Sequence, residues 1–318
     1  LLVMSPQLID PQGKNIGTDF MTVWSAGTLV LNDRPADAYN YQKHFEVQRA
    51  ALPWEAGKKI PYYGWLYPPI FLMVAAGLAL LSYGWALTLW MVGTLWAYLV
   101  TVRSILHDRT ALMAALAFPG TFVNLGHGQN GFVTAALLGG GLLLLETRSY
   151  VAGFLFGLMA YKPQFGVLIP LALLAGGGHW RAMISASFTV LAAILASCLF
   201  LGLETWQAFF NSLSLTRDLV LEQGSAGWER IQSVFSAVRL LGGSIELAYA
   251  LQTIYGVLAA MAVIWAWHRR APAPIKNAAL VTATMMISPY IFDYDLVALA
   301  LPITWLTAWG LREGFLSW

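Results

Sequence analysis

The sequence predicts an all-α integral membrane protein, a multi-helix transmembrane bundle with extracytoplasmic loops. Hydrophobic residues make up 58% of the 318 residues and charged residues only 11%, and the mean hydropathy is +0.63. Soluble domains carry about 25% charged residues, so this composition does not describe a soluble all-α core. The apolar residues also gather in long runs that short polar breaks separate, which is typical of membrane helices.

Ten apolar runs predict the helices in order. Several of them are shorter than the roughly 20 residues that a helix needs to cross a bilayer. We therefore expect half-helices or bent helices that line a cavity. The runs cover residues 67–82, 84–102, 110–123, 131–145, 149–161, 163–178, 180–203, 247–267, 278–292 and 294–310.

Two long polar segments divide the series. Residues 1–66 are predicted to form a first extracytoplasmic loop with juxtamembrane segments, and 67–202 the transmembrane helices that follow it. Residues 203–245 mix tryptophan and phenylalanine with arginine, which indicates an extracytoplasmic interfacial segment, and 246–318 hold the C-terminal transmembrane helices. Because the sequence starts at Leu1, we expect a further membrane helix before it.

The short loops predict the orientation, since lysine and arginine in short loops mark the cytoplasmic side. The breaks at 124–130, 161–163 and 288–295 contain only one such residue, Lys162, and are predicted to be extracytoplasmic. The basic residues of the opposite, cytoplasmic side are Arg103, Arg109, Arg148, Arg181, Arg269, Arg270, Lys276 and Arg312.

The number of crossings leaves two topologies. With 1–66 and 124–130 on the same side, the run at 67–82 has to be a juxtamembrane or re-entrant helix. Alternatively 67–82 crosses fully and 149–178 is a single kinked span, which makes the 124–130 loop cytoplasmic. The alternative ranks second because it places arginines of the short loops outside.

Several function classes are excluded. A net charge of +2 without a large basic cluster gives no support for nucleic-acid binding, and the single Cys198 cannot form an internal disulfide. His127 has no HxxxH or HExxH partner, so neither a protein-held metal nor a cofactor is predicted. The glycine triplets 139–141 and 176–178 lack the lysine of a phosphate loop and are attributed to close packing and a turn.

Polar residues at membrane depth are costly and usually mark function. Lys162 follows an apolar run and precedes Pro163, where its ammonium can meet an anion, although it could also snorkel to the interface. His127, Gln129 and Asn130 interrupt another apolar stretch in "NLGHGQNGF". The glycines that flank His127 disfavour a helix there and allow a ligand to approach the backbone, and a plain polar turn is the alternative.

Aspartates occur at two further breaks. Asp19, in "GTDF", precedes an aromatic-rich stretch, and a lone aspartate in a loop is most often a turn or cap residue. Asp293 and Asp295 flank Tyr294 in "SPYIFDYD" and are equally consistent with helix caps. On the preferred topology all these polar residues share the extracytoplasmic side.

Five motifs, in this order, resemble glycosyltransferase family 87: "GTDF" followed by "VW" and "AG", "YPP" at Tyr67, "NLGHGQNGF", "AYKPQFG", and "SPY" followed by "YDL". This membrane family, formerly a domain of unknown function, includes bacterial polyprenyl-phosphate-mannose-dependent α-1,2-mannosyltransferases. The resemblance covers most of the chain. It implies a GT-C fold, a lipid-linked sugar donor and a catalytic aspartate in the first extracytoplasmic loop, which by motif is Asp19. Mannosyltransferase members carry His after "SP", where this chain has Asp293, Tyr294 and Asp295.

The resemblance gives the polar residues a chemical task. Sugar transfer from a polyprenyl phosphate needs a base for the acceptor hydroxyl and cations or hydrogen-bond donors for the leaving phosphate. Asp19 is then the expected base, with inversion of the anomeric carbon, and Lys162 is expected to hold the phosphate, with His127, Gln129 and Asn130 as hydrogen-bond donors. The other predicted substrate-binding residues are Tyr67, Asp293, Tyr294 and Asp295.

The expected partners are a polyprenyl-phosphate sugar, a lipid or glycan acceptor of the cell envelope, and membrane lipids, with the protein in a bacterial inner membrane. A transporter or flippase of a lipid-linked or polar solute is the main alternative, but no internal repeat is visible and the distant Asp19 is left without a role. A non-catalytic assembly subunit is the third reading, and it leaves the polar residues without a task.

Overall fold

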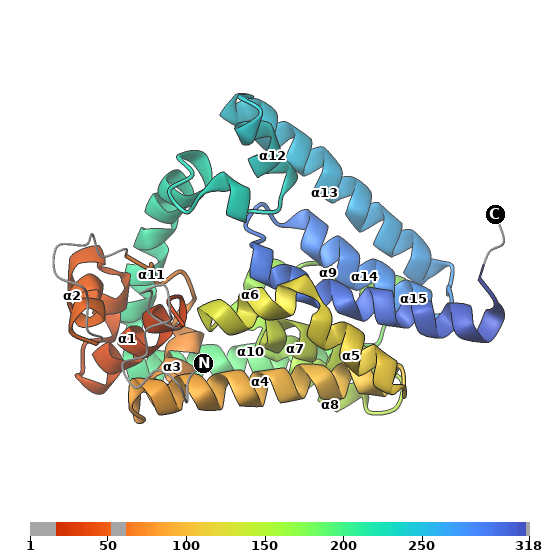
Figure 1. The fold of residues 1–318 in the computed structure, drawn as a ribbon, viewed down its shortest axis with the longest axis horizontal. Helices are drawn as coiled ribbons and strands as arrows, with labels where there is room; N and C mark the ends of the chain where they lie inside the picture. Colours follow the sequence, from red (N-terminus) through yellow and green to blue (C-terminus); the bar gives the residue numbers. More distant parts are fainter. Residues whose placement is uncertain (1–16, 52–61, 316–318) are drawn as a thin grey trace. The chain divides into compact units, whose positions relative to one another are not determined.

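The computed structural model describes residues 17–51 and 62–315, and within these ranges the chain is helical with no extended strand (Figure 1). This confirms the predicted all-α membrane fold. Among the described residues, four helical stretches are long and apolar enough to cross a bilayer. They are α4 (Tyr83–Ile105), α10 (Trp180–Leu201), α13 (Ile245–His268) and the stretch Asp293–Glu313.

The chain forms two compact units, and neither is continuous in sequence. Helices α4, α6 (Pro119–His127) and α10 contribute residues to both. Unit 1 comprises Leu1–Thr94, Val123–Gln129 and Leu191–Thr216, and unit 2 comprises Leu95–Phe122, Asn130–Val190 and Arg217–Trp318.

Unit 1 is organised around α1 (Phe20–Leu31), an apolar helix that lies inside the segment predicted as a loop. Phe20 and Leu29 of α1 are fully buried. Gly27 lets α1 pack directly on the backbone of α3, because a Cβ there would collide with the carbonyl of Ala75. The other helices of unit 1 are η1 (Pro35–Tyr39), α2 (Tyr41–Ala51), α3 (Pro69–Ala79) and α11 (Leu203–Thr216).

Unit 2 is a bundle whose helices overlap the predicted apolar runs. The predicted run 110–123 is divided into two helices at Phe118, and α14 (Ala273–Ile287) begins and ends five residues before the predicted run 278–292. Glycines 139 and 141 of α7 face Thr101, Leu301 and Phe156 at distances that leave no room for a side chain, so the first glycine triplet serves close packing as predicted. The helices that lie entirely in unit 2 are α5 (Arg109–Ala117), α7 (Gly131–Leu144), α8 (Ser149–Leu158), η2 (Met159–Tyr161), η3 (Pro163–Phe165), α9 (Leu168–Ala175), the π-helix η4 (Arg217–Glu222), η5 (Trp228–Arg230), α12 (Val234–Leu240), α13, α14, η6 (Asp293–Leu299) and α15 (Ala300–Glu313).

The segment 149–178 is a helical hairpin and not a single kinked span. It begins and ends at the same place, because Arg148 and Arg181, which flank it, line one pocket. Its turn is at Lys162, where short 3₁₀ helices lie on both sides. The second-ranked topology, which required one span here, is therefore wrong in this respect.

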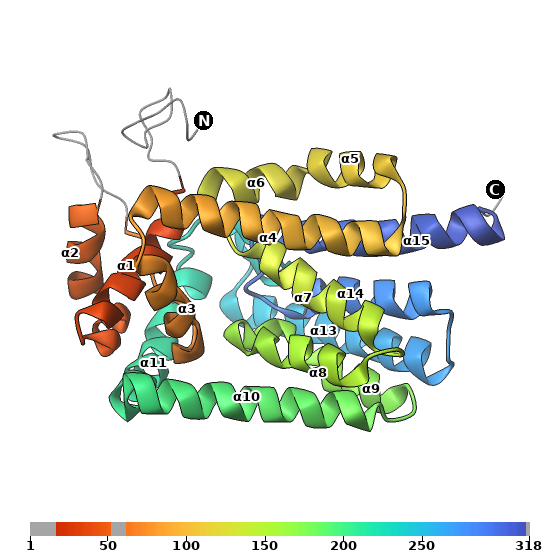
Figure 2. The ribbon, with the colours of Figure 1, turned by 90° about the horizontal axis from the view of Figure 1, so that it is seen from below.

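The short loops of unit 2 that carry arginine lie together at one end of the bundle (Figure 2). These are the connections α4–α5, α7–α8, α9–α10 and α13–α14, and the end of α15 lies with them. The Lys162 turn lies at the other end, since the first helix of the hairpin separates it from Arg148. The predicted separation of basic loops from the polar breaks is thus present in the packing of this unit.

Candidate functional site

The loop that carries Asp19 is held by backbone contacts to the end of α6. The Asp19 N–H donates to the carbonyl of His127 at 3.0 Å, and the Tyr83 hydroxyl donates to the carbonyl of Gly17 at 2.7 Å. Gly17 has φ of +70°, a conformation that glycine adopts without strain. These contacts bring the first and third motifs of the sequence together within unit 1.

The Asp19 carboxylate is not used as a helix cap. Asp19 occupies the N-cap position of α1 but its side chain makes no capping hydrogen bond. Its Oδ2 instead accepts from Gln129 Nε2 at 2.6 Å, and the residue is only 8% exposed. This arrangement differs from that of the common turn or cap aspartate, which bonds to its own helix.

Gly128 makes the close approach of the two loops possible. It has φ of +72°, and a Cβ there would lie 2.6 Å from the Cβ of Phe20. The neighbouring His127 accepts from or donates to the Thr18 hydroxyl through Nδ1 at 3.0 Å. The expectation that glycines keep His127 out of a helix was wrong, because α6 continues through Gly126 to His127 and the break begins at Gly128. A single glycine at the helix end is enough to turn the chain.

Unit 2 holds a second polar cluster around Lys162. The Lys162 ammonium donates to Asp295 Oδ1 at 2.6 Å, and the two side chains are 4% and 1% exposed. Asp295 Oδ2 also accepts from the N–H of Phe292 at 3.2 Å, so this aspartate is both a cap and an ion-pair partner. The ammonium lies 4.8 Å from the centre of the Tyr294 ring. Lys162 is therefore buried in a built polar site and does not extend to an interface.

Asn130 contacts Tyr161, the residue that precedes Lys162. The Tyr161 hydroxyl bonds to Thr134 Oγ1 at 2.6 Å and donates to the backbone carbonyl of Asn130 at 3.4 Å. Asn130 is 2% exposed and precedes α7. The break at 124–130 thus serves both units, with Gln129 bonded in unit 1 and Asn130 packed in unit 2.

Arg230 is a member of this region that sequence reasoning did not single out. Its guanidinium lies 3.8 Å from Asp293 Oδ2, with about a third of each side chain exposed. The contact arises because Gln232 N–H donates to the Ile291 carbonyl at 2.7 Å. No spacing in the sequence links 203–245 with 288–295, so only the fold could reveal the pair.

Tyr67 has a packing environment in unit 1. Its ring lies 5.1 Å from that of Trp65 and 5.0 Å from that of Phe71, and its backbone carbonyl accepts from the Tyr39 hydroxyl at 2.9 Å. Pro68 is extended and Pro69 starts α3, which explains the "YPP" motif as a helix start. Among the described residues no group of three or more His, Cys, Asp or Glu could hold a metal ion.

Comparison with known families decides the class of the protein. The family model "Glycosyltransferase family 87" matches residues 65–289. The chain belongs to glycosyltransferase family 87. It is therefore a glycosyltransferase. Its family, together with the four long apolar helices among its described residues, indicates an integral membrane protein. No curated protein and no solved structure matches the chain.

The family match includes one part of each cluster. His127, Gln129 and Lys162 lie inside the matched range, whereas Asp19 and the stretch 293–295 lie outside it. The contacts of these outer residues nevertheless join them to matched ones: Asp19 to Gln129, and Asp295 to Lys162. A glycosyltransferase needs a sugar donor and an acceptor.

Proposed function

We propose that this glycosyltransferase moves a hexose, such as mannose, from a polyprenyl phosphate to a lipid or glycan acceptor on the extracytoplasmic face of a bacterial inner membrane. The observation that carries the proposal is the buried Asp19 carboxylate, which Gln129 holds at 2.6 Å and which makes no helix cap. Its orientation by the Gln129 amide suits a group that accepts a proton.

In the proposed reaction Asp19 takes the proton of the acceptor hydroxyl, while the oxygen of that hydroxyl bonds to the anomeric carbon. The bond from that carbon to the phosphate oxygen breaks, and the polyprenyl phosphate leaves with the electron pair. Attack opposite the leaving group inverts the anomeric carbon. Gln129, first expected to bind the phosphate, has its amide directed at Asp19, so we assign it the orientation of the base.

We propose that the phosphate is bound by the Lys162 cluster. The Lys162 ammonium and the Arg230 guanidinium are donors that suit phosphate oxygens. A buried ammonium attracts an anion more strongly than an ammonium in water does, since fewer water molecules screen its charge. Asn130, Asp293, Tyr294 and Asp295 line the same cluster, and His127 with Tyr67 remain proposed contacts of the substrate in unit 1.

The experiment is transfer by purified protein. Polyprenyl-phosphate mannose and glucose, and the corresponding nucleotide sugars, are each offered in radiolabelled form with acceptors extracted from bacterial envelopes. We expect label to pass from a polyprenyl phosphate sugar only, and the product to have the opposite anomeric configuration by NMR. Transfer from a nucleotide sugar without lipid, or retained configuration, contradicts the proposal.

A further inference from the structure

Gln252 is a polar residue buried inside an apolar helix. It is 5% exposed in α13, which is long and apolar enough to cross a bilayer. An amide in such surroundings costs free energy unless it forms hydrogen bonds, and its oxygen and nitrogen can bond groups on two sides. The partners of Gln252 are backbone groups of α12 and α14, so this side chain joins three helices.

The Gln252 amide satisfies the ends of two helices at once. Its Oε1 accepts from the N–H of Phe235 at 3.1 Å, in the first turn of α12. Its Nε2 donates to the carbonyls of Met286 and Ile287, also at 3.1 Å, at the end of α14. Helix ends leave such backbone groups without a partner in their own helix. Gln252 therefore determines where α12 begins relative to where α14 ends.

Close packing brings the amide to this place. Gly256 lies one turn after Gln252, and an added Cβ there would lie 3.2 Å from the Ile287 side chain. The small residue lets α13 approach the end of α14. The contact is thus part of the packing of unit 2 and does not depend on an exposed loop.

Two chain segments, 230–235 and 287–293, run antiparallel away from the Gln252 amide. They are joined by an antiparallel bridge between Ile231 and Phe292. With the amide at one end and this bridge near the other, neither segment can slide along its partner without the loss of hydrogen bonds. The relative position of the segments is therefore fixed over their length.

The charged groups of the proposed phosphate site lie at the far ends of these segments. Arg230 begins the first segment, and its guanidinium lies 3.8 Å from Asp293, the last residue of the second. Asp295, two residues further along, accepts from the Lys162 ammonium at 2.6 Å. Because the hydrogen bonds of Gln252 go to backbone groups, it influences these charges through the two segments.

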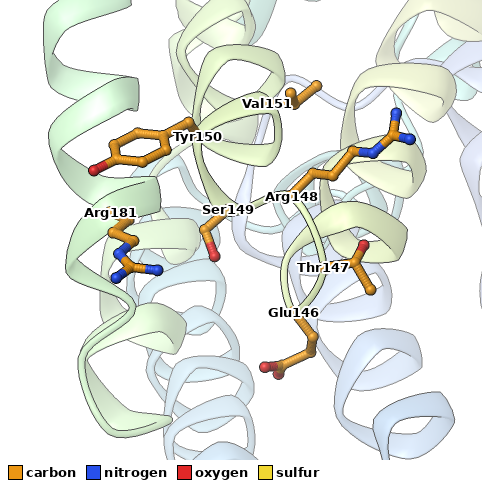
Figure 3. A pocket seen from close by; sticks show the side chains of 7 residues that line it. All are labelled: Glu146, Thr147, Arg148, Ser149, Tyr150, Val151 and Arg181. Atoms are coloured by element: carbon orange, nitrogen blue, oxygen red, sulfur yellow. The ribbon is translucent and has the colours of Figure 1, made fainter.

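The opposite end of α14 is held separately. The fully buried Trp267 donates to the Lys276 carbonyl at 3.0 Å, and the Lys276 ammonium lies 3.3 Å from Glu146. Glu146 lines the pocket at the arginine-bearing end of unit 2 (Figure 3). Removal of the Gln252 amide is therefore expected to loosen the end of α14 near Ile287 and to leave its other end in place.

We propose that Gln252 is a positioning residue, which holds the segments 230–235 and 287–293 so that the Arg230 and Lys162 donors point at one phosphate. The inference rests on the proposed binding of the donor phosphate by this cluster. A residue that only stabilised the bundle would affect the whole of unit 2, whereas a positioning residue affects these two segments and the ligand that they bind.

The test uses the full chain in one detergent, with farnesyl phosphate as the probe of the phosphate site. Gln252→Leu removes the amide at similar size, and Gln252→Asn keeps an amide that is one methylene too short to bond both segments. The matched control is Gln48→Leu in unit 1, where a glutamine that is 1% exposed also bonds backbone groups, those of Tyr63 at 2.6 and 3.2 Å. Unfolding temperatures establish which variants are folded, and Gln252→Asn carries the test if Gln252→Leu does not fold.

We expect Gln252→Leu to weaken the binding of farnesyl phosphate about tenfold, within the range by which residues of one network affect each other. Gln48→Leu should leave it unchanged. With Arg230→Gln added, the loss should be clearly smaller than the product of the two single losses, because both changes act on the same donor. Amide hydrogen exchange of 230–235 and 287–293 should be faster in Gln252→Leu and unchanged in Gln48→Leu.

The outcomes separate this inference from the proposed function. Weaker binding in Arg230→Gln with wild-type binding in Gln252→Leu overturns the role of Gln252 and leaves the proposed phosphate site intact. An equal loss in Gln48→Leu also overturns it, since general destabilisation is then the cause. If Arg230→Gln binds farnesyl phosphate as tightly as wild type, the proposed phosphate site is wrong and hydrogen exchange alone decides: faster exchange in both segments supports their positioning by Gln252, and unchanged exchange overturns it.

Discussion

The ammonium of Lys162 lies 2.6 Å from Asp295, and the two side chains are almost completely buried. Breaking a buried ion pair by removing one partner leaves an uncompensated charge and costs about 3–5 kcal/mol. The pair therefore stabilises the turn of the 149–178 hairpin against η6. A role of Lys162 in binding and a role in folding have to be separated before either is accepted.

A double variant in which both residues of the ion pair are replaced by neutral amides separates the binding role of Lys162 from its role in folding. Lys162→Gln alone should lower the free energy of unfolding, whereas Lys162→Gln with Asp295→Asn removes both charges and should recover much of that loss. If Lys162 binds the donor phosphate, the double variant should still bind a polyprenyl-phosphate analogue more weakly by about 1.5–3 kcal/mol, the range for a hydrogen bond to a charged group. Titration of the analogue against all variants in one detergent measures this. A stable double variant with wild-type affinity restricts Lys162 to a structural role.

Asp19→Asn tests the proposed base. The amide keeps the size of the side chain and can still meet Gln129 after rotation of either amide, but it cannot accept the proton of the acceptor. Transfer should fall by at least about 10²-fold, the lower end for general-base catalysis. Asp33→Asn is the control, since Asp33 is an exposed aspartate of the same unit. Initial rates at saturating donor decide the matter, and a folded Asp19→Asn protein with normal turnover rules the role out.

Gly128→Ala and Gly126→Ala form a matched pair at the contact of the Asp19 loop with α6. Gly128 has φ of +72° and a Cβ would meet Phe20 at 2.6 Å, so alanine should cost about 1–2 kcal/mol from backbone strain alone and shift the Asp19 loop. Gly126 has nothing within 4 Å of an added Cβ and lies in a helix, where alanine is favoured by up to about 1 kcal/mol. Chemical unfolding should therefore show lower stability for Gly128→Ala and equal or higher stability for Gly126→Ala. Only Gly128→Ala should lower the transfer rate. The same change in stability for both substitutions contradicts the argument that Gly128 is required for close packing on Phe20.

Much of the fold could be predicted because apolar runs carry their own signal. The limits of α4, α7, α10 and α13 follow the runs within three residues, and the glycine triplets serve packing and a turn as expected. The apolar helix α1 was missed because charged residues on both sides conceal its 12 residues in the sequence.

The candidate site was predictable in its members but not in its pairings. Gln129, Lys162 and Asp295 were recognised as polar residues next to apolar runs, and Asp19 by its motif. No local pattern states that Gln129 meets Asp19 or that Lys162 meets Asp295. These contacts join residues more than 100 positions apart, and tertiary packing alone determines them. The Arg230 to Asp293 contact was missed for the same reason.

The sidedness of the membrane topology can be tested with single cysteines on a Cys198→Ala background. We predict that Leu125→Cys and Gln232→Cys, both at exposed positions, react with a membrane-impermeant thiol reagent in intact cells. Thr147→Cys, in an exposed loop among the arginines, should react only after the membrane is opened. Mass-shift labelling on gels reports each site. The reversed pattern places the arginine end outside and refutes the proposed orientation.

His44 should make the stability of unit 1 depend on pH. Its ring is completely buried, with Nε2 3.2 Å from the Thr22 carbonyl, and burial lowers its pKa to about 4, a fall that the Thr22 hydrogen bond partly opposes. Because the unfolded chain binds a proton near pH 6.5 and the folded protein only near pH 4, the stabilising effect is complete above pH 6.5 and is lost as the pH falls through this window. A difference of this size corresponds to about 3 kcal/mol across the window. Unfolding midpoints of the purified protein at pH 7.5 and 4.5 should differ, and His44→Asn should reduce the difference while His107→Asn, at an exposed histidine, should not. An unchanged pH dependence in His44→Asn means that other groups control the acid stability of the protein.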